Sequence, residues 1–158
     1  MTSRVLALSV ALLAQAQPIA DPVRWSLAHA NPRPVTRGST VTVKLSADIR
    51  AGWHLYSIAQ PRGGPIETEI SLPPGQPFTF AKPIGAPKPH LIYDPTFGML
   101  VQLYTEKAEF VLPIKVAVDA QAGAQTLTVD ARYQSCNDTI CLAPRTSKVT
   151  LVLQVRGE

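Results

Sequence analysis

The chain is poor in the residue types from which most catalytic and metal sites are built. Its 158 residues include two cysteines, three histidines and two methionines, and only 16% are charged. The 15 basic residues outnumber the 11 acidic ones, but they are scattered, whereas nucleic-acid binding requires a basic stripe or cluster. The sequence also has no nucleophile elbow, no phosphate-binding loop and no pair of carboxylates at a meaningful spacing. These absences argue against a hydrolase and against a nucleic-acid-binding protein.

Metal binding has little support in the sequence. A structural zinc site usually takes four cysteine or histidine ligands, but His29, His54 and His90 are scattered along the chain without ligand spacing. Two cysteines can bind Cu(I), yet no methionine cluster supports copper, because Met99 is the only methionine after Met1. We therefore expect no resident cofactor or metal, and a copper-handling module is kept as a minor alternative.

Residues 1–16 have the features of a secretory signal peptide. Arg4 supplies a positive charge, Val5–Leu13 form a short apolar core, and Ala14–Ala16 match a small-x-small cleavage site. The apolar core is about half as long as the roughly 20 residues that span a membrane, so we expect cleavage after Ala16 and no membrane insertion afterwards. The remaining residues, 17–158, are enough for one domain with its own core. Export would place both cysteines in an oxidising compartment.

Two-residue alternation and frequent prolines predict an all-β fold. In Thr40–Ile49, apolar residues alternate with polar ones, which is the pattern of a strand with one buried face. Fifteen prolines, many of them in turn-forming clusters, separate short segments of this kind, and no helical period is sustained after residue 16. We predict an immunoglobulin-like β-sandwich. The other predicted strands are Arg24–Ala28, Trp53–Ile58, Ile66–Leu72, Leu100–Tyr104, Glu109–Val118, Thr126–Tyr133 and Ser147–Val155.

The predicted strand Trp53–Ile58 presents aromatic residues on both of its faces. Trp53 and Leu55 share one face, and we expect that face to enter the core. His54 and Tyr56 share the opposite face, where they are either ordinary strand residues or part of a surface groove.

The two cysteines, Cys136 and Cys141, are five positions apart, and Asn137-Asp138 between them favours a turn. Because a predicted strand leads in and another leads away, we expect the pair near the tip of a β-hairpin. A disulfide across so short a loop would stabilise the fold by only about 2 kcal/mol in the chain-entropy model. We therefore interpret the pair as redox-active, with a structural disulfide as the alternative.

The cysteine hairpin resembles the N-terminal periplasmic domain of the thiol:disulfide interchange protein DsbD. The resemblance rests on Tyr133-Gln134-Ser135-Cys136, a short spacer, and Cys141-Leu142-Ala143-Pro144 before a final strand. Weaker matches are Gly52–Tyr56, Tyr93–Tyr104 and the pair Leu112-Pro113. The resemblance extends over nearly all of the chain after the signal peptide.

This resemblance implies an immunoglobulin-like domain that relays electrons to periplasmic disulfide isomerases and other thioredoxin-like proteins. Cys141 would form the mixed disulfide with a partner, and Cys136 would resolve it. Phe97 would be the aromatic residue of a cap loop that shields the pair until a partner docks, with Asp94 in the same loop. Tyr133 would pack beside the active site. The sulfur atoms carry both electrons, so no cofactor is implied.

Two departures from the family separate the expected fold from the expected activity. The spacer of four residues between the cysteines is one shorter than in the best-known members. The 158 residues also include neither the membrane electron-transport domain nor the thioredoxin-like domain of the full-length family protein, so a separate membrane donor would have to reduce the pair. We therefore expect an electron carrier, in the manner of a protein-disulfide reductase. The alternative is a non-catalytic β-sandwich for binding or assembly, with a permanent disulfide.

Overall fold

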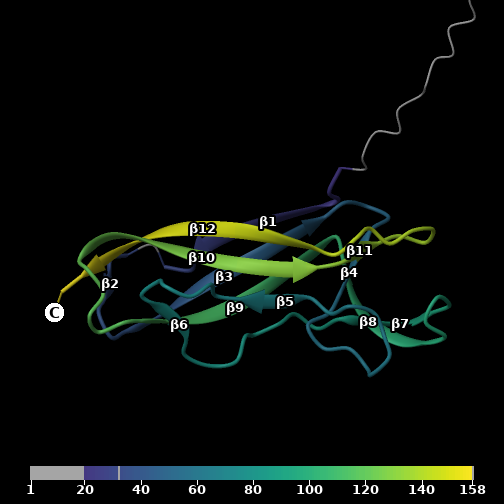
Figure 1. Cartoon of the computed structure of the whole chain (residues 1–158), viewed down its shortest axis with the longest axis horizontal. Helices are drawn as coiled ribbons and strands as arrows, with labels where there is room; N and C mark the ends of the chain where they lie inside the picture. Colours follow the sequence, from purple (N-terminus) through teal and green to yellow (C-terminus); the bar gives the residue numbers. More distant parts are fainter. Residues whose placement is uncertain (1–19, 32, 158) are drawn as a thin grey trace, which may run out of the picture.

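The computed structural model describes residues 20–31 and 33–157, so the predicted signal peptide lies outside the described residues. Within these ranges the chain forms twelve β-strands and no helix, and Figure 1 shows how the strands are arranged. The predicted all-β, immunoglobulin-like sandwich is confirmed. None of the described segments is a helix long and apolar enough to cross a membrane.

Two four-stranded sheets form the body of the sandwich. In the order of their hydrogen bonding, the first sheet consists of β1 (Val23–His29), β3 (Thr40–Ile49), β9 (Lys107–Val116) and β6 (Phe78–Phe80). The second consists of β2 (Val35–Thr36), β12 (Arg145–Arg156), β10 (Gly123–Tyr133) and β5 (Glu69–Ser71). All pairings in the two sheets are antiparallel except that of β2 with β12.

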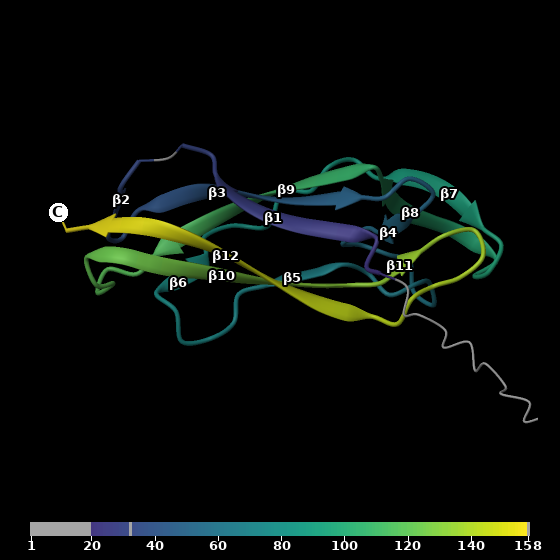
Figure 2. The ribbon, with the colours of Figure 1, turned by 90° about the horizontal axis from the view of Figure 1, so that it is seen from above.

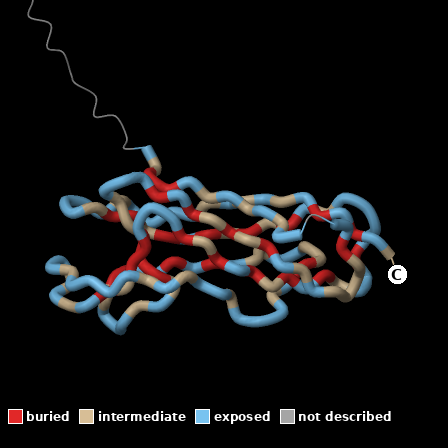
Figure 3. Tube along the Cα trace, turned by 180° about the vertical axis from the view of Figure 1, so that it is seen from behind, coloured by how far each residue is buried: buried red, intermediate tan, exposed pale blue. Residues whose placement is uncertain are grey.

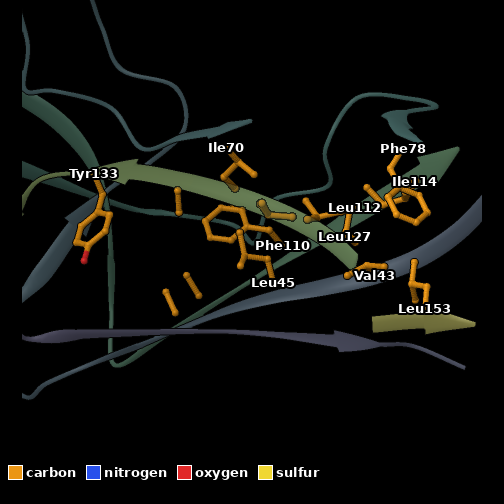
Figure 4. Close-up of a cluster of buried hydrophobic side chains, with 14 of the residues drawn as sticks. Val43, Leu45, Ile70, Phe78, Phe110, Leu112, Ile114, Leu127, Tyr133 and Leu153 are labelled. Atoms are coloured by element: carbon orange, nitrogen blue, oxygen red, sulfur yellow. The ribbon is translucent and has the colours of Figure 1, made fainter. Parts of the chain in front are cut away.

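Alternating side chains from both sheets fill the space between them. Along β3, Val43, Leu45 and Ala47 are fully buried while their polar neighbours face outward, which confirms the alternation predicted for this strand. Figure 4 shows large apolar side chains from β3, β9 and β10 meeting in this core. Figure 3 shows the buried segments along the middle of the elongated domain, with exposed loops at both ends. Apolar burial on this scale is the main stabilising contribution to the fold.

A third sheet lies at one end of the sandwich, opposite the end that holds β2 and the C-terminus (Figures 1 and 2). Its strands, in order, are β11 (Ser135–Cys136), β4 (His54–Tyr56), β8 (Met99–Thr105) and β7 (His90–Asp94), all antiparallel. It has its own small core, made of Tyr56, Val101, Leu103 and Cys136. This sheet carries the cysteine pair.

The structure corrects the predicted strands at the short and irregular elements. The segments that form β2, β6, β7 and β11 were not predicted, because two to five residues without alternation give no periodic signal. The predicted strand Ile66–Leu72 is reduced to β5, and Ile66 at its start is exposed. Trp53–Ile58 is likewise reduced to β4, although Trp53 packs against the main core and Leu55 is fully buried, as predicted.

Candidate redox-active disulfide site

The cysteines lie on a tight hairpin that connects β10 to β12. The backbone N–H of Asn137 donates to the carbonyl of Ile140 at 2.9 Å, and that of Leu142 donates to the carbonyl of Ser135 at 2.9 Å. Inside the turn, the Oδ1 of Asn137 accepts hydrogen bonds from the N–H groups of Thr139 (2.9 Å) and Ile140 (2.8 Å). The predicted turn at Asn137 is therefore present, and it holds the two cysteines opposite one another.

Cys136 and Cys141 form a disulfide, with the two sulfurs 2.03 Å apart. The two residues differ sharply in exposure: Cys136 is 1% exposed, whereas Cys141 is on the surface. Because thiol–disulfide exchange requires a direct approach of the attacking sulfur, this asymmetry makes Cys141 the side of the bond that another protein can reach.

Cys136 is buried because β11 pairs with β4. Ser135 lies opposite Leu55, and Cys136 lies opposite His54. On the same face, Cys136 packs with Tyr56 and with Val101 and Leu103 of β8. The inner cysteine is thus fixed by packing, while the outer one projects from the turn.

Phe97 covers this small core from the loop between β7 and β8. Its ring meets the ring of Tyr56 edge to face, with centroids 6.1 Å apart and an angle of 87° between the planes. The loop is closed by Asp94: its carbonyl accepts from the N–H of Gly98 at 2.8 Å, and its Oδ1 accepts from the N–H of Thr96 at 2.8 Å. Gly98 has a φ of 64°, a left-handed conformation that favours glycine. Phe97 is half-buried and packs against the small core that contains Cys136.

A hydrogen bond connects the start of the Phe97 loop to β4. The hydroxyl of Tyr56 donates to Oδ2 of Asp94 at 2.9 Å. Burial raises the pKa of Tyr56, and the hydrogen bond and negative charge of Asp94 raise it further. For Asp94, partial burial acts to raise the pKa, but hydrogen bonds from Tyr56 and from the backbone of Thr96 and Phe97 outweigh it and lower the pKa. Asp94 is thus a carboxylate and Tyr56 a neutral donor at neutral pH.

A shallow cavity of about 230 Å³ brings these groups together with the outer cysteine. Cys141, Tyr56 and Asp94 line it, with Asn137 and Asp138 from the hairpin. Its rim includes the exposed apolar side chains of Ile92 and Tyr93 on β7. Larger cavities, two of about 480 Å³ and one of about 430 Å³, are lined by none of these residues.

The predicted site residues are only partly assembled at this cavity. The structure places Cys136, Cys141, Phe97 and Asp94 at one end of the domain. Tyr133 instead belongs to the main core, where its ring centroid lies 5.3 Å from that of Trp25.

Tyr133 connects the base of the hairpin to the start of the described chain. Its hydroxyl donates to Asp21 and lies 3.1 Å from Oγ of Ser147, and burial together with Asp21 raises the pKa of Tyr133 to about 12. Asp21 also forms a salt bridge with Arg145, with 3.2 Å between Oδ2 of Asp21 and a guanidinium nitrogen. Arg145 lies opposite Tyr133 in the pairing of β10 with β12. Tyr133 therefore links the start of the described chain to β10 and β12, the strands on either side of the cysteine hairpin.

Two further residues at the site, Tyr56 and His54, were identified in the sequence only as possible groove residues. Tyr56 is 1% exposed and its ring contacts Phe97, so it belongs to the small core and also lines the inner wall of the shallow cavity. His54 contacts Tyr56, with ring centroids 5.2 Å apart. Burial lowers the pKa of His54, and the charges of Asp94 and Asp138 partly oppose this. Among the described residues, no group of three or more His, Cys, Asp or Glu side chains could hold a metal ion.

Comparison with known proteins gives one family. The family model described as "Thiol:disulfide interchange protein DsbD, N-terminal" matches residues 27–153, which include both cysteines and every strand of the third sheet. No curated protein sequence matches closely enough to count as a relative.

Two solved structures share the fold. The reduced N-terminal domain of DsbD from Neisseria meningitidis is 14% identical, with a TM-score of 0.53, over 82% of this chain and 85% of that one. The N-terminal periplasmic domain of ScsB from Proteus mirabilis is 18% identical, with a TM-score of 0.55, over 88% of this chain. The match spans only 49% of that second chain, about half its length.

Proposed function

Because the chain belongs to the family of N-terminal domains of the thiol:disulfide interchange protein DsbD, we propose that it exchanges electrons with partner proteins through Cys136 and Cys141. The observation that carries this proposal is the asymmetry of the disulfide, with Cys141 exposed and Cys136 buried at the same turn. One sulfur can meet a partner while the other stays in a fixed position to resolve the mixed disulfide. A structural disulfide does not require one exposed and one buried cysteine.

The exchange follows from ordinary disulfide chemistry. In the reduced protein, the thiolate of Cys141 attacks one sulfur of a partner disulfide, and the other partner sulfur leaves as a thiolate and takes up a proton. The thiolate of Cys136 then attacks the sulfur of Cys141, and the second partner sulfur leaves. The partner gains two electrons and two protons, and this chain is left with the disulfide seen in the structure.

The cap loop controls access to Cys136 during this exchange. Phe97 packs on the small core that contains Cys136, and the bond from Tyr56 to Asp94 holds the loop in place. A docking partner would displace Phe97 and so open the small core around Cys136. Until then the cap limits access of small thiols to the inner sulfur.

The surface around Cys141 supports a protein as the partner. Large apolar side chains are exposed near Cys141: Ile92 and Tyr93 line the same cavity, and Ile140 precedes Cys141 on the hairpin. Exposed apolar residues beside a candidate site favour contact with another protein. We assign the partner to the thioredoxin-like proteins and disulfide isomerases of the periplasm, with a separate membrane-bound dithiol protein as the electron donor.

The first test is the reduction potential of the pair, measured by equilibrating the protein in thiol redox buffers and counting alkylated cysteines. We expect a value between roughly −180 and −270 mV, the range of known exchange proteins. A potential below about −300 mV would mark a structural disulfide and favour the binding-module alternative. A variant with both cysteines replaced by serine is the control, which should fold but exchange no electrons.

A further inference from the structure

The buried position of Cys136 creates a problem for the second step of the exchange. A thiolate is the attacking species, so the thiol of Cys136 must lose its proton before it can attack Cys141. Burial in apolar surroundings makes that loss harder, and Cys136 packs against Tyr56, Val101 and Leu103 at 1% exposure. Bulk water has little access to take the proton. A nearby protein group is therefore needed.

His54 lies in a position from which its side chain can accept the proton of the Cys136 thiol. It lies directly opposite Cys136 in the antiparallel pairing of β4 with β11. Side chains of such a pair share a face of the sheet, with Cβ atoms typically about 4.5–5.5 Å apart. The contact between the rings of His54 and Tyr56, and the presence of Tyr56 and Cys136 in one small core, show that all three lie on the same face.

The imidazole of His54 also has an unused polar atom. Its Nε2 is buried and has no hydrogen-bond partner among residues 20–31 and 33–157. The groups that act on it electrostatically are the carboxylates of Asp94, from β7, and Asp138, from the hairpin tip. Tyr56 is the titratable neighbour on its own strand, and Thr105 lies opposite it on β8.

We propose that His54 takes the proton of the Cys136 thiol when that thiol attacks the mixed disulfide at Cys141. This inference rests on the proposed function and adds a residue to it. Burial keeps the imidazole neutral at neutral pH, so it is free to accept a proton. The two carboxylates lie where they stabilise the imidazolium that forms.

The step balances in atoms and electrons. The proton of Cys136 passes to the imidazole, and the new thiolate forms the bond to the sulfur of Cys141. The bond between Cys141 and the partner sulfur breaks, and the partner leaves as a thiolate. The imidazolium then gives its proton to that thiolate or to solvent, which restores neutral His54.

The test follows the reaction of the reduced protein with 5,5′-dithiobis(2-nitrobenzoate). Attack by Cys141 releases one coloured thionitrobenzoate in a bimolecular phase, and attack by Cys136 on the resulting mixed disulfide releases a second in a unimolecular phase. The unimolecular phase isolates the step in which we place His54. In the unmodified protein its rate should be almost constant between about pH 7 and 8, where neutral His54 is already available.

Replacement of the histidine should change the second phase alone. In His54→Gln we expect that phase to slow at least about tenfold at neutral pH and then to rise about tenfold per pH unit up to and beyond the ordinary thiol pKa of roughly 8.5, because Cys136 is buried. The first phase should keep its rate, and imidazole added to His54→Ala should partly restore the second. His29→Gln is the matched control, because His29 is also half-buried but lines a cavity with residues of β2, at the other end of the domain.

Three results would overturn the role of His54. One is a second phase in the unmodified protein that rises about tenfold per pH unit, which needs no variant to observe. Another is a His54→Gln variant with the same rate and pH profile as the unmodified protein. The third is an equal slowing in His29→Gln. Failure of the proposed function is distinct: the protein would then show two phases with this reagent but no exchange with thioredoxin-like proteins.

Discussion

Replacing Tyr56 with phenylalanine removes one hydroxyl and with it the bond that holds the cap loop to β4. The donor is 1% exposed, and the acceptor is the carboxylate of Asp94, 2.9 Å away. A hydrogen bond to a charged group contributes about 1.5–3 kcal/mol, and water can reach Asp94, so we expect Tyr56→Phe to lower the free energy of unfolding by about 1–2 kcal/mol. The phenylalanine ring keeps the contacts with Phe97 and His54, which limits the loss to the polar interaction.

The loss should depend on pH in a defined direction. The pKa of Asp94 is lowered in the folded protein, so its contribution is fully present above the unfolded aspartate pKa of about 3.9 and disappears as the pH falls through the folded value. Urea unfolding of the disulfide-bonded protein at neutral and acidic pH measures this. The difference between unmodified protein and Tyr56→Phe should be largest at neutral pH and shrink in acid.

The same variant tests whether the cap gates the disulfide. If the loop must open for the inner sulfur to react, a loss of 1–2 kcal/mol corresponds to about a 5–30-fold higher open population. Reduction by dithiothreitol should accelerate by up to that factor. Tyr93→Phe is the matched control, since Tyr93 lines the same cavity but is 60% exposed, and its effect should stay within about 0.5 kcal/mol. An unchanged stability in Tyr56→Phe, or a loss that persists in acid, would refute the role given to the bond with Asp94.

Two further predictions concern the cysteines and the cap. Cys136→Ser should accumulate a stable mixed disulfide between Cys141 and a thioredoxin-like partner, visible on a non-reducing gel, whereas Cys141→Ser should not; equal trapping by both variants would contradict the assignment of Cys141 as the attacking residue. Phe97→Ala removes the edge-to-face contact with Tyr56, worth about 0.5–1.5 kcal/mol, and uncovers the small core. It should therefore speed the reaction of small thiols with the disulfide, and an unchanged rate would show that Phe97 is only a packing residue.

The amino-acid sequence was sufficient to predict the class of fold and the turn that carries the two cysteines. Alternation in a long strand such as β3 is local, because its buried face must repeat every second residue. The cysteine turn is local as well: Asn137 bonds to the backbone two and three residues ahead, whatever surrounds it. The same holds for Phe97, whose loop between Asp94 and Gly98 is closed by contacts within five residues.

What the sequence left open depends on contacts between distant segments. Tyr56 and Asp94 are 38 positions apart, and nothing in either segment indicates that a hydroxyl and a carboxylate will meet. The placement of His54 opposite Cys136 is a matter of strand register, and a shift by one residue would turn His54 to the other face. Tyr133 precedes the cysteine motif in sequence, yet its side chain enters the main core because β10 continues the second sheet.

The different exposure of the two cysteines shows this division most clearly. The spacing of Cys136 and Cys141 on one turn does not distinguish them, and only the family resemblance implied different roles for the two. Only the pairing of β11 with β4 buries the first, while the second, beyond the turn, stays on the surface. Whether the two cysteines can form a disulfide depends on their spacing along the chain, which is a local property. Which of the two a partner can reach depends on packing against strands that are distant in sequence.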